Sequence, residues 1–417
     1  MPKRKLKNKI NTLSPPQLIV TFYSISILIS VVLLSLPVAL QPGVTWSFID
    51  VLFTAVSAVS VTGLSVVSTA DTFSTTGIVM LMFIFQFGGV GIMTLGTFFW
   101  LLLGKKIGLK ERRLIMTDQN LTNLSGLVVL MRQILLIIVL IEIVGALILG
   151  TYFLNYYPTW QEAYLHGLFA SVSATTNAGF DITGESFIPF ANDYFVQFIT
   201  IILLTLGAIG FPVLIEVKNY ILNRNQKERS HFSLYTKLTT LTFFGLMLFG
   251  TIAILILDWN YFFRDKSWHE SFFYALFQSS TTRSGGLATM DVSHFSEPTL
   301  LVICLLMFIG ASPSSVGGGI RTTTFALNLL FIFSFARGYR SIKLFKRELH
   351  PDDVNRSLAV TMMAGILCFI SLVFLKLTQP FSILEILFEV TSAFGTTGLS
   401  MGITPDLDTI GKIIITG

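Results

Sequence analysis

This sequence of 417 residues has little charge for its length. Only 12% of its residues are Asp, Glu, Lys or Arg, whereas soluble globular proteins carry about 25%. Hydrophobic residues make up 53%, and several apolar runs reach the length of about 20 residues that a helix needs to cross a bilayer. This composition excludes an ordinary soluble domain, and continuous runs favour membrane-spanning helices over a β-barrel.

Cysteine and clustered reactive groups are also scarce. Cys304 and Cys368 both lie inside hydrophobic runs, which argues against structural disulfides. The isolated histidines His166, His269 and His294 have no partner at metal-ligand spacing. An intramembrane enzyme would need a group of nucleophiles, bases or paired acids at membrane depth, and we find none. We therefore predict a protein that is not an enzyme.

Basic residues gather beside long apolar runs. Their four clusters cover residues 3–9, 105–113, 218–237 and 337–347, the last with Arg356. Under the positive-inside rule these segments, including the N-terminus, lie in the cytoplasm. The net charge of +5 then reflects membrane topology rather than binding to nucleic acid. We predict a multi-pass protein of the plasma membrane, in contact with lipid.

The same order of parts occurs four times between these clusters. A long apolar run precedes a short one of about 14 residues, too short to span a bilayer. A patch of Gly, Ser and Thr follows, and a second long run completes the unit. Surface-lying helices or short spans would not explain four patches of the same chemistry. The short runs with their patches read WSFIDVLFTAVSAVSVTGLS, WQEAYLHGLFASVSATTNAGF, WHESFFYALFQSSTTRSGGL and FSILEILFEVTSAFGTTGLS.

We predict an all-α integral membrane fold of four tandem helix–pore-loop–helix repeats around a pseudo-fourfold pore axis. The last helix of repeat four is expected to be missing from this chain. Each short helix enters from the outside, where the proposed segments are mostly acidic and would concentrate cations. The predicted divisions are a basic N-terminus (1–17), repeat 1 (18–104, filter 61–65), a cytoplasmic linker with repeat 2 (105–223, filter 176–180), repeat 3 (224–347, filter 282–287, loop 311–319) and a truncated repeat 4 (348–417, filter 396–400).

The four patches are suited to binding a monovalent cation through their backbone. They align on one glycine each, at intervals of 116, 107 and 112 residues. They contain no carboxylate, and rings of carbonyl groups can replace the hydration shell of potassium. Glycine lets the backbone approach the axis and turn its carbonyls inward. The candidate carbonyls belong to Val61, Thr62, Gly63, Asn177, Ala178, Gly179, Ser284, Gly285, Gly286, Thr396, Thr397 and Gly398.

Two charged residues inside apolar segments need partners. Arg283 stands in the third patch, where a guanidinium pointing at the axis would repel cations. We expect it to brace the patch from behind, bonded to backbone carbonyls or to an acidic neighbour. Glu142 lies in the first long run of repeat 2, and we expect it to pair with a neighbouring helix.

The second long run of repeat 3 predicts a broken helix. Residues 300–335 are too many for one span, and their middle holds Pro313 and three consecutive glycines. Irregular backbone at membrane depth must line a cavity, so we predict a gating loop below the filter. Its residues are Ala311, Ser312, Pro313, Ser314, Ser315, Val316, Gly317, Gly318 and Gly319, followed by Arg321. The glycines of GGVG and LGAIGFP in repeats 1 and 2 predict close packing or a modest kink.

Taken together, the motifs VTGLS, TNAGF, TRSGGL and TTGLS with the loop GASPSSVGGGIRTTTF resemble the Trk/Ktr/HKT superfamily of potassium transporters. The chain looks most like the bacterial KtrB type, because it has no extra helices before repeat 1. The resemblance implies a homodimer with one potassium pathway per subunit and a sodium-dependent flux. It also implies a cytosolic KtrA-type regulatory ring that binds ATP or ADP, whereas the chain itself binds no cofactor other than ions.

Alternatives remain open at this point. A sodium-permeable protein, or a proton- or sodium-coupled secondary transporter, also uses broken helices and midplane sites. Such a transporter predicts titratable residues at the site and inverted repeats, whereas these repeats share one orientation. Within the family that the chain resembles, glycine rather than serine at position 63 favours potassium. The chain ends where the second helix of repeat 4 should begin, so we expect a truncated fourth repeat.

Overall fold

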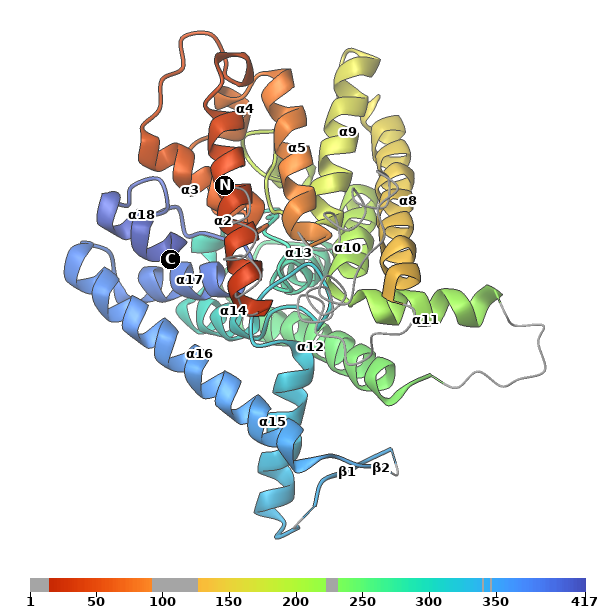
Figure 1. Ribbon diagram of the computed structural model, residues 1–417. Coiled ribbons are helices and arrows are strands. Elements are labelled where there is room, and N and C mark those ends of the chain that lie inside the picture. Colours follow the sequence, from red (N-terminus) through yellow and green to blue (C-terminus); the bar gives the residue numbers. More distant parts are fainter. Residues whose placement is uncertain (1–14, 92–126, 223–231, 340, 346) are drawn as a thin grey trace, which may run out of the picture.

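The computed structural model describes residues 15–91, 127–222, 232–339, 341–345 and 347–417. Within them almost all of the regular secondary structure is helical, as the composition predicts (Figure 1). A short antiparallel hairpin of β1 (Lys343–Leu344) and β2 (Arg347–Glu348) is the exception. Four helices in the described part of the chain are long and apolar enough to span a membrane, and each is the first long helix of a repeat: α2 (Pro15–Leu34), α8 (Leu127–Phe153), α12 (Leu234–Asp258) and α16 (Pro351–Thr378).

Four short helices follow these spans, as the repeat predicts. They are α3 (Phe48–Val59), α9 (Trp160–Thr175), α13 (Trp268–Thr281) and α17 (Ile383–Phe394). Each begins after a serine or threonine cap. The side chain of this cap accepts a hydrogen bond from the backbone amide of the acidic residue three positions after it. This capping and the acidic first turn fix where each short helix starts. The cap and acid pairs are Ser47 with Asp50, Thr159 with Glu162, Ser267 with Glu270 and Ser382 with Glu385.

The second helices of the repeats are less regular. They are α5 (Thr75–Gly89), α10 (Tyr194–Ala208) with α11 (Phe211–Leu222), α14 (Glu297–Ile309) with α15 (Thr322–Ala336), and α18 (Thr409–Thr416). The helix of repeat 4 that we expected to be missing is thus present as the eight residues of α18, which are too few to span a bilayer. The break between α14 and α15 confirms the predicted interruption. For the glycines of repeats 1 and 2 we predicted close packing or a modest kink. Close packing is confirmed, because a Cβ on Gly88 would lie 2.3 Å from the Val59 carbonyl oxygen and one on Gly207 would lie 2.2 Å from that of Thr175. A modest kink is wrong for repeat 2, because α10 and α11 are bent by 105°. Single turns complete the described elements: η1 (Pro37–Ala39), α4 (Thr69–Thr72), η2 (Ile188–Phe190) and η3 (Val292–His294).

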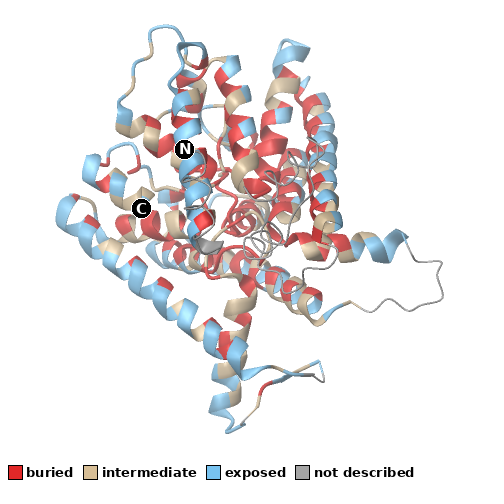
Figure 2. Ribbon diagram, viewed as in Figure 1, coloured by how far each residue is buried: buried red, intermediate tan, exposed pale blue. Residues whose placement is uncertain are grey.

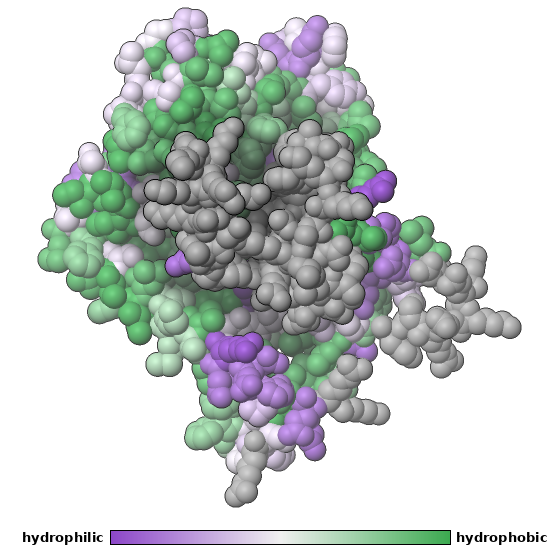
Figure 3. Space-filling model, in the orientation of Figure 1, coloured by the Kyte–Doolittle hydropathy of each residue, from purple (hydrophilic) through white to green (hydrophobic). Residues whose placement is uncertain are grey.

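The buried residues gather where the short helices end, in the centre of the view (Figure 2). The long helices turn apolar faces outward: Met363 and Leu377 of α16 are 71% and 77% exposed. Such faces need lipid or another protein surface. Hydrophilic residues gather at the lower end of the molecule, around the hairpin and the start of α16 (Figure 3). The predicted boundary at 104/105 and the basic cluster at 105–113 lie outside the described residues.

Candidate functional site

The four aligned glycines meet around one axis. A Cβ added to Gly63 would lie 2.9 Å from the Cα of Gly179 and 3.2 Å from that of Gly398. A Cβ added to Gly286 would lie 2.7 Å from the Cα of Gly179 and 3.4 Å from that of Gly398. Each glycine therefore adjoins those of the two neighbouring repeats, and the order around the ring follows the chain. The predicted pseudo-fourfold arrangement is confirmed.

The same strained turn leads into each glycine of the ring. Two residues before it, the backbone is left-handed at a residue with a side chain: φ is 50° at Val61, 51° at Asn177, 76° at Ser284 and 45° at Thr396. These are half of the eight such residues in the described part of the chain. The conformation costs about 1–3 kcal/mol at each position and gathers where a site must be held in one shape. The glycines themselves have φ of 71–89°.

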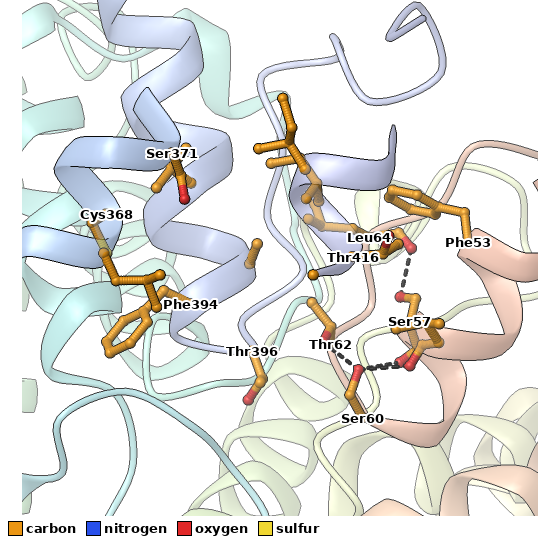
Figure 4. Close-up of a pocket in the computed structure, with 17 residues that line it drawn as sticks. Phe53, Ser57, Ser60, Thr62, Leu64, Cys368, Ser371, Phe394, Thr396 and Thr416 are labelled. Atoms are coloured by element: carbon orange, nitrogen blue, oxygen red, sulfur yellow. Dashed lines mark hydrogen bonds between the residues drawn. The ribbon is translucent and has the colours of Figure 1, made fainter. Parts of the chain in front are cut away.

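A serine stands six residues before each glycine, and in repeats 1, 2 and 4 it supports the turn, whereas Ser280 of repeat 3 donates to the Leu276 carbonyl of its own helix. Ser57 and Ser173 donate to the carbonyls just beyond the ring, those of Leu64 and Phe180, at 2.6 Å each. Ser392 accepts the amide of its own ring glycine at 3.1 Å. The aligned repeats contain this signal, but our sequence analysis missed it. Ser57 and Leu64 lie beside a cavity of about 270 Å³ at the seam between repeats 1 and 4 (Figure 4).

The predicted gating loop lies against the inner end of these turns. Residues 310–321 are non-helical, so the break is slightly longer than the predicted 311–319. A Cβ on Gly317 would lie 2.4 Å from the Cβ of Ser284, and one on Gly318 would lie 2.8 Å from Thr396. The Gly318 amide donates to the Ser284 hydroxyl at 3.4 Å. The structure thus brings the loop and the turns of repeats 3 and 4 into direct contact.

Two arginines, the buried Arg283 and the half-buried Arg321, brace this region through backbone carbonyls. Arg283 is 1% exposed and turns behind the ring, as the sequence analysis expects. Neither guanidinium forms an ion pair with a carboxylate among the described residues. The acceptors are the carbonyls of Leu306 (3.0 Å) and Gly310 (3.4 Å) for Arg283, and of Ser312 (3.3 Å) and Gly317 for Arg321.

One cavity adjoins the ring and another adjoins the loop. The first, of about 340 Å³, is lined by Gly63, Gly179 and residues just beyond them, including the carboxylate-bearing Asp181. The second, of about 140 Å³, is lined by the loop, by Arg321 and by the glycines near the end of α5. The ring therefore borders one space, the loop borders another, and Asp181 places a carboxylate in the wall of the first.

Two buried carboxylates lie away from the axis. Glu142 of α8 accepts a hydrogen bond from Gln86 of α5 at 2.8 Å, which supplies the neighbouring-helix partner that the sequence could not name. Glu389 of α17 is 1% exposed. Its carboxylate accepts hydrogen bonds from the Ser400 hydroxyl and from the Thr404 hydroxyl, the latter at 2.9 Å. It ties the short helix of repeat 4 to the segment beyond the ring.

The fold and the ring define a class: a multi-pass membrane protein whose four linked repeats surround one central axis. Residues 10–416 match the family model TrkH, described as "Cation transport protein". The chain belongs to the TrkH family of cation transport proteins. As the sequence predicts, this is a family of transport proteins rather than enzymes.

Two curated relatives and one solved structure place the chain more closely. It is 62% identical over 411 residues to "Ktr system potassium uptake protein D" of Bacillus subtilis, across 99% of this chain and 91% of the relative. It is 35% identical over 409 residues to "Ktr system potassium uptake protein B" of the same organism, across 96% and 89%. The crystal structure of the potassium transporter TrkH from Vibrio parahaemolyticus superposes with a TM-score of 0.70 at 18% identity, across 89% of this chain and 75% of that one. At this identity the superposition shows the fold alone.

Proposed function

We propose that this chain is the potassium-translocating subunit of a Ktr-type uptake system in the plasma membrane, with its N-terminus in the cytoplasm. The observation that carries the proposal is the ring of Gly63, Gly179, Gly286 and Gly398, approached by four identically strained turns. The backbone carbonyls of these turns, from the residues predicted above, replace the hydration shell of potassium. The names of the two Bacillus subtilis relatives support potassium as the substrate.

The intramembrane loop acts as the gate in this proposal. It contacts Ser284 and Thr396 at the inner end of the ring, where an ordered loop obstructs an ion. The C-terminal ends of the four short helices point toward the ring and favour a cation there. Arg321, held on loop carbonyls, keeps its charge away from the axis.

The proposal extends to partners and to a second ion. Two copies of the chain form a homodimer surrounded by lipid, each with its own pathway, and sodium ions accompany potassium flux. A cytosolic KtrA-type ring carrying ATP or ADP sets the state of the gate. The hydrophilic surface around the hairpin and the start of α16 supports a docking site on the inner side (Figure 3).

The test is uptake in cells that lack their own potassium transporters, with and without a co-expressed regulatory subunit. The wild-type chain is expected to restore growth at low potassium, and sodium is expected to increase uptake. Gly63→Asp is expected to abolish uptake at equal membrane abundance, and unchanged uptake would refute the filter assignment. Deletion of residues 312–319 is expected to raise unregulated flux, and unchanged flux would refute the gate.

A further inference from the structure

The break in the second helix of repeat 2 brings its backbone against the intramembrane loop. The chain turns by 105° between α10 and α11, and φ at Gly210 is +103°. A Cβ at Gly210 would lie 2.8 Å from the Pro313 carbonyl oxygen. Glycine is therefore required here both by the turn and by the close approach of the loop.

Main-chain hydrogen bonds join the two segments. A helix that breaks leaves carbonyl and amide groups without partners in its own ladder, and the loop supplies partners for them. Two amides of the loop donate to carbonyls of α10: Ser312 to Ala208 (3.0 Å) and Val316 to Gly207 (3.3 Å). In the other direction, the Phe211 amide donates to the Ser314 carbonyl of the loop (2.8 Å). A side chain adds one more bond, because the Tyr235 hydroxyl on α12 donates to the Pro313 carbonyl at 2.6 Å.

We propose that residues 207–211 and Tyr235 form a clasp that holds the intramembrane loop in its obstructing position. This inference rests on the proposed function, in which the loop is the gate. The clasp residues position the loop and do not touch the ion. The clasp is distinct from the arginine braces, because the groups that hold the loop belong to repeat 2 and α12, whereas the braces are side chains of the third turn (Arg283) and of the loop itself (Arg321).

The direction of α11 gives the clasp a way to open. This helix starts at the clasp and runs away from the centre of the molecule to its exposed end at Tyr220, Ile221 and Leu222 (Figure 1). The amide of Phe211 is at its first residue, so tilting α11 about Gly210 turns that N–H group relative to the Ser314 carbonyl and weakens the bond between them. A displacement of the outer end of α11 therefore reaches the loop through a hinge of a few residues.

A backbone substitution tests the clasp directly. Phe211→Pro removes the amide that donates to Ser314, and proline is tolerated at the first position of a helix. Phe211→Ala is the matched control, because it removes the same buried ring but keeps the amide. One hydrogen bond of typical size shifts a two-state population by about fivefold. Rubidium influx into liposomes containing the purified protein is therefore expected to be several-fold higher for Phe211→Pro than for Phe211→Ala.

A second substitution keeps the test decisive if proline impairs folding. Tyr235→Phe removes only the hydroxyl that donates to Pro313, and it is expected to raise rubidium influx over the wild type. Tyr261→Phe is its control, since Tyr261 is 64% exposed and lies on the outer side. Potassium-over-sodium selectivity is expected to stay unchanged in the clasp variants, because the ring is untouched.

The outcomes separate the clasp from the gate. If deletion of residues 312–319 raises influx but Phe211→Pro matches Phe211→Ala and Tyr235→Phe matches the wild type, the clasp is wrong and the gate stands. If the deletion leaves influx unchanged, the proposed gate itself is wrong. Lost selectivity in Tyr235→Phe would also contradict the clasp, because it would show that the hydroxyl acts on the ring.

Discussion

At the scale of single residues, the ring depends on glycine for two separate reasons. The φ of 88° at Gly63 disfavours any side chain, and a Cβ there would also lie 2.7 Å from the Ala178 carbonyl oxygen. The strain and the contact act on the same few atoms, so a single methyl group must displace the neighbouring repeat. The site is therefore sensitive to changes that alter no charge.

The first prediction concerns this methyl group. Gly63→Ala is expected to lower potassium uptake by at least tenfold, about 1.4 kcal/mol or more, and to weaken selectivity over sodium. Gly245→Ala is the control, because a Cβ at that helical position meets nothing within 4 Å. Uptake of both ions in transport-deficient cells, corrected for membrane abundance, is the measurement. Equal uptake by the two variants would show that the ring tolerates displacement.

The second prediction concerns the buried carboxylate behind the ring. Glu389→Ala removes the acceptor of the Ser400 hydroxyl and one of the two acceptors of the buried Thr404 hydroxyl, which also donates to Ser400, and a hydrogen bond to a charged group contributes about 1.5–3 kcal/mol. Glu389→Gln keeps an acceptor oxygen and is expected to retain most of the thermal stability and selectivity. Melting in detergent and uptake selectivity are the measurements. If glutamine were as damaging as alanine, the charge rather than the hydrogen bonds would be essential.

At the scale of elements, the four short helices share one design for their first turn. The Ser267 and Ser382 side chains accept the Glu270 and Glu385 amides, and both glutamates return a bond to the cap amide. This reciprocal arrangement satisfies amides that a helix start leaves unpaired. It holds the first turn of α13 and α17, whereas α3 and α9 have only the bond from the amide to the cap side chain, and the other end of each helix presents the strained turn.

The third prediction follows from this cap. Ser382→Ala is expected to destabilise the protein by about 1 kcal/mol and to lower the apparent affinity for potassium only slightly. Ser24→Ala, on the exposed face of α2, is the control and is expected to be neutral. Thermal unfolding in detergent compares the two. A neutral Ser382→Ala would mean that packing alone fixes where α17 begins.

Much of the architecture at this scale could be predicted from sequence. Hydrophobic length and the fourfold pattern define the long helices, the short helices and the break in repeat 3, because those signals are local. The 105° bend after Ala208 could not be predicted, since the bonds that stabilise it join Phe211 to Ser314, about a hundred residues away. The serines behind the ring were predictable from the aligned repeats, whereas the partner of Glu142 required the packing of two helices.

At the scale of the whole molecule, the four repeats must close into a ring although the chain is linear. Consecutive repeats are joined by covalent connections, but the first and the last meet only through contacts. One such contact is the ion pair between Asp50 at the start of α3 and Lys412 of α18, 2.7 Å apart. The two side chains are 19% and 13% exposed, so solvent screens the pair less than a surface pair.

The fourth prediction is that this pair stabilises the closed ring. Asp50→Asn and Lys412→Gln are each expected to lower the unfolding temperature, and the double variant is expected to lose less than the sum. The coupling energy should be about 1 kcal/mol, at the upper end for partly exposed pairs. Asp71→Asn, outside any ion pair in the described part of the chain, is the control.

Because the pair joins only repeats 1 and 4, its loss should also reduce selectivity by loosening the contact between Gly63 and Gly398. Additive single effects with unchanged selectivity would show that packing at the seam closes the ring without the charges.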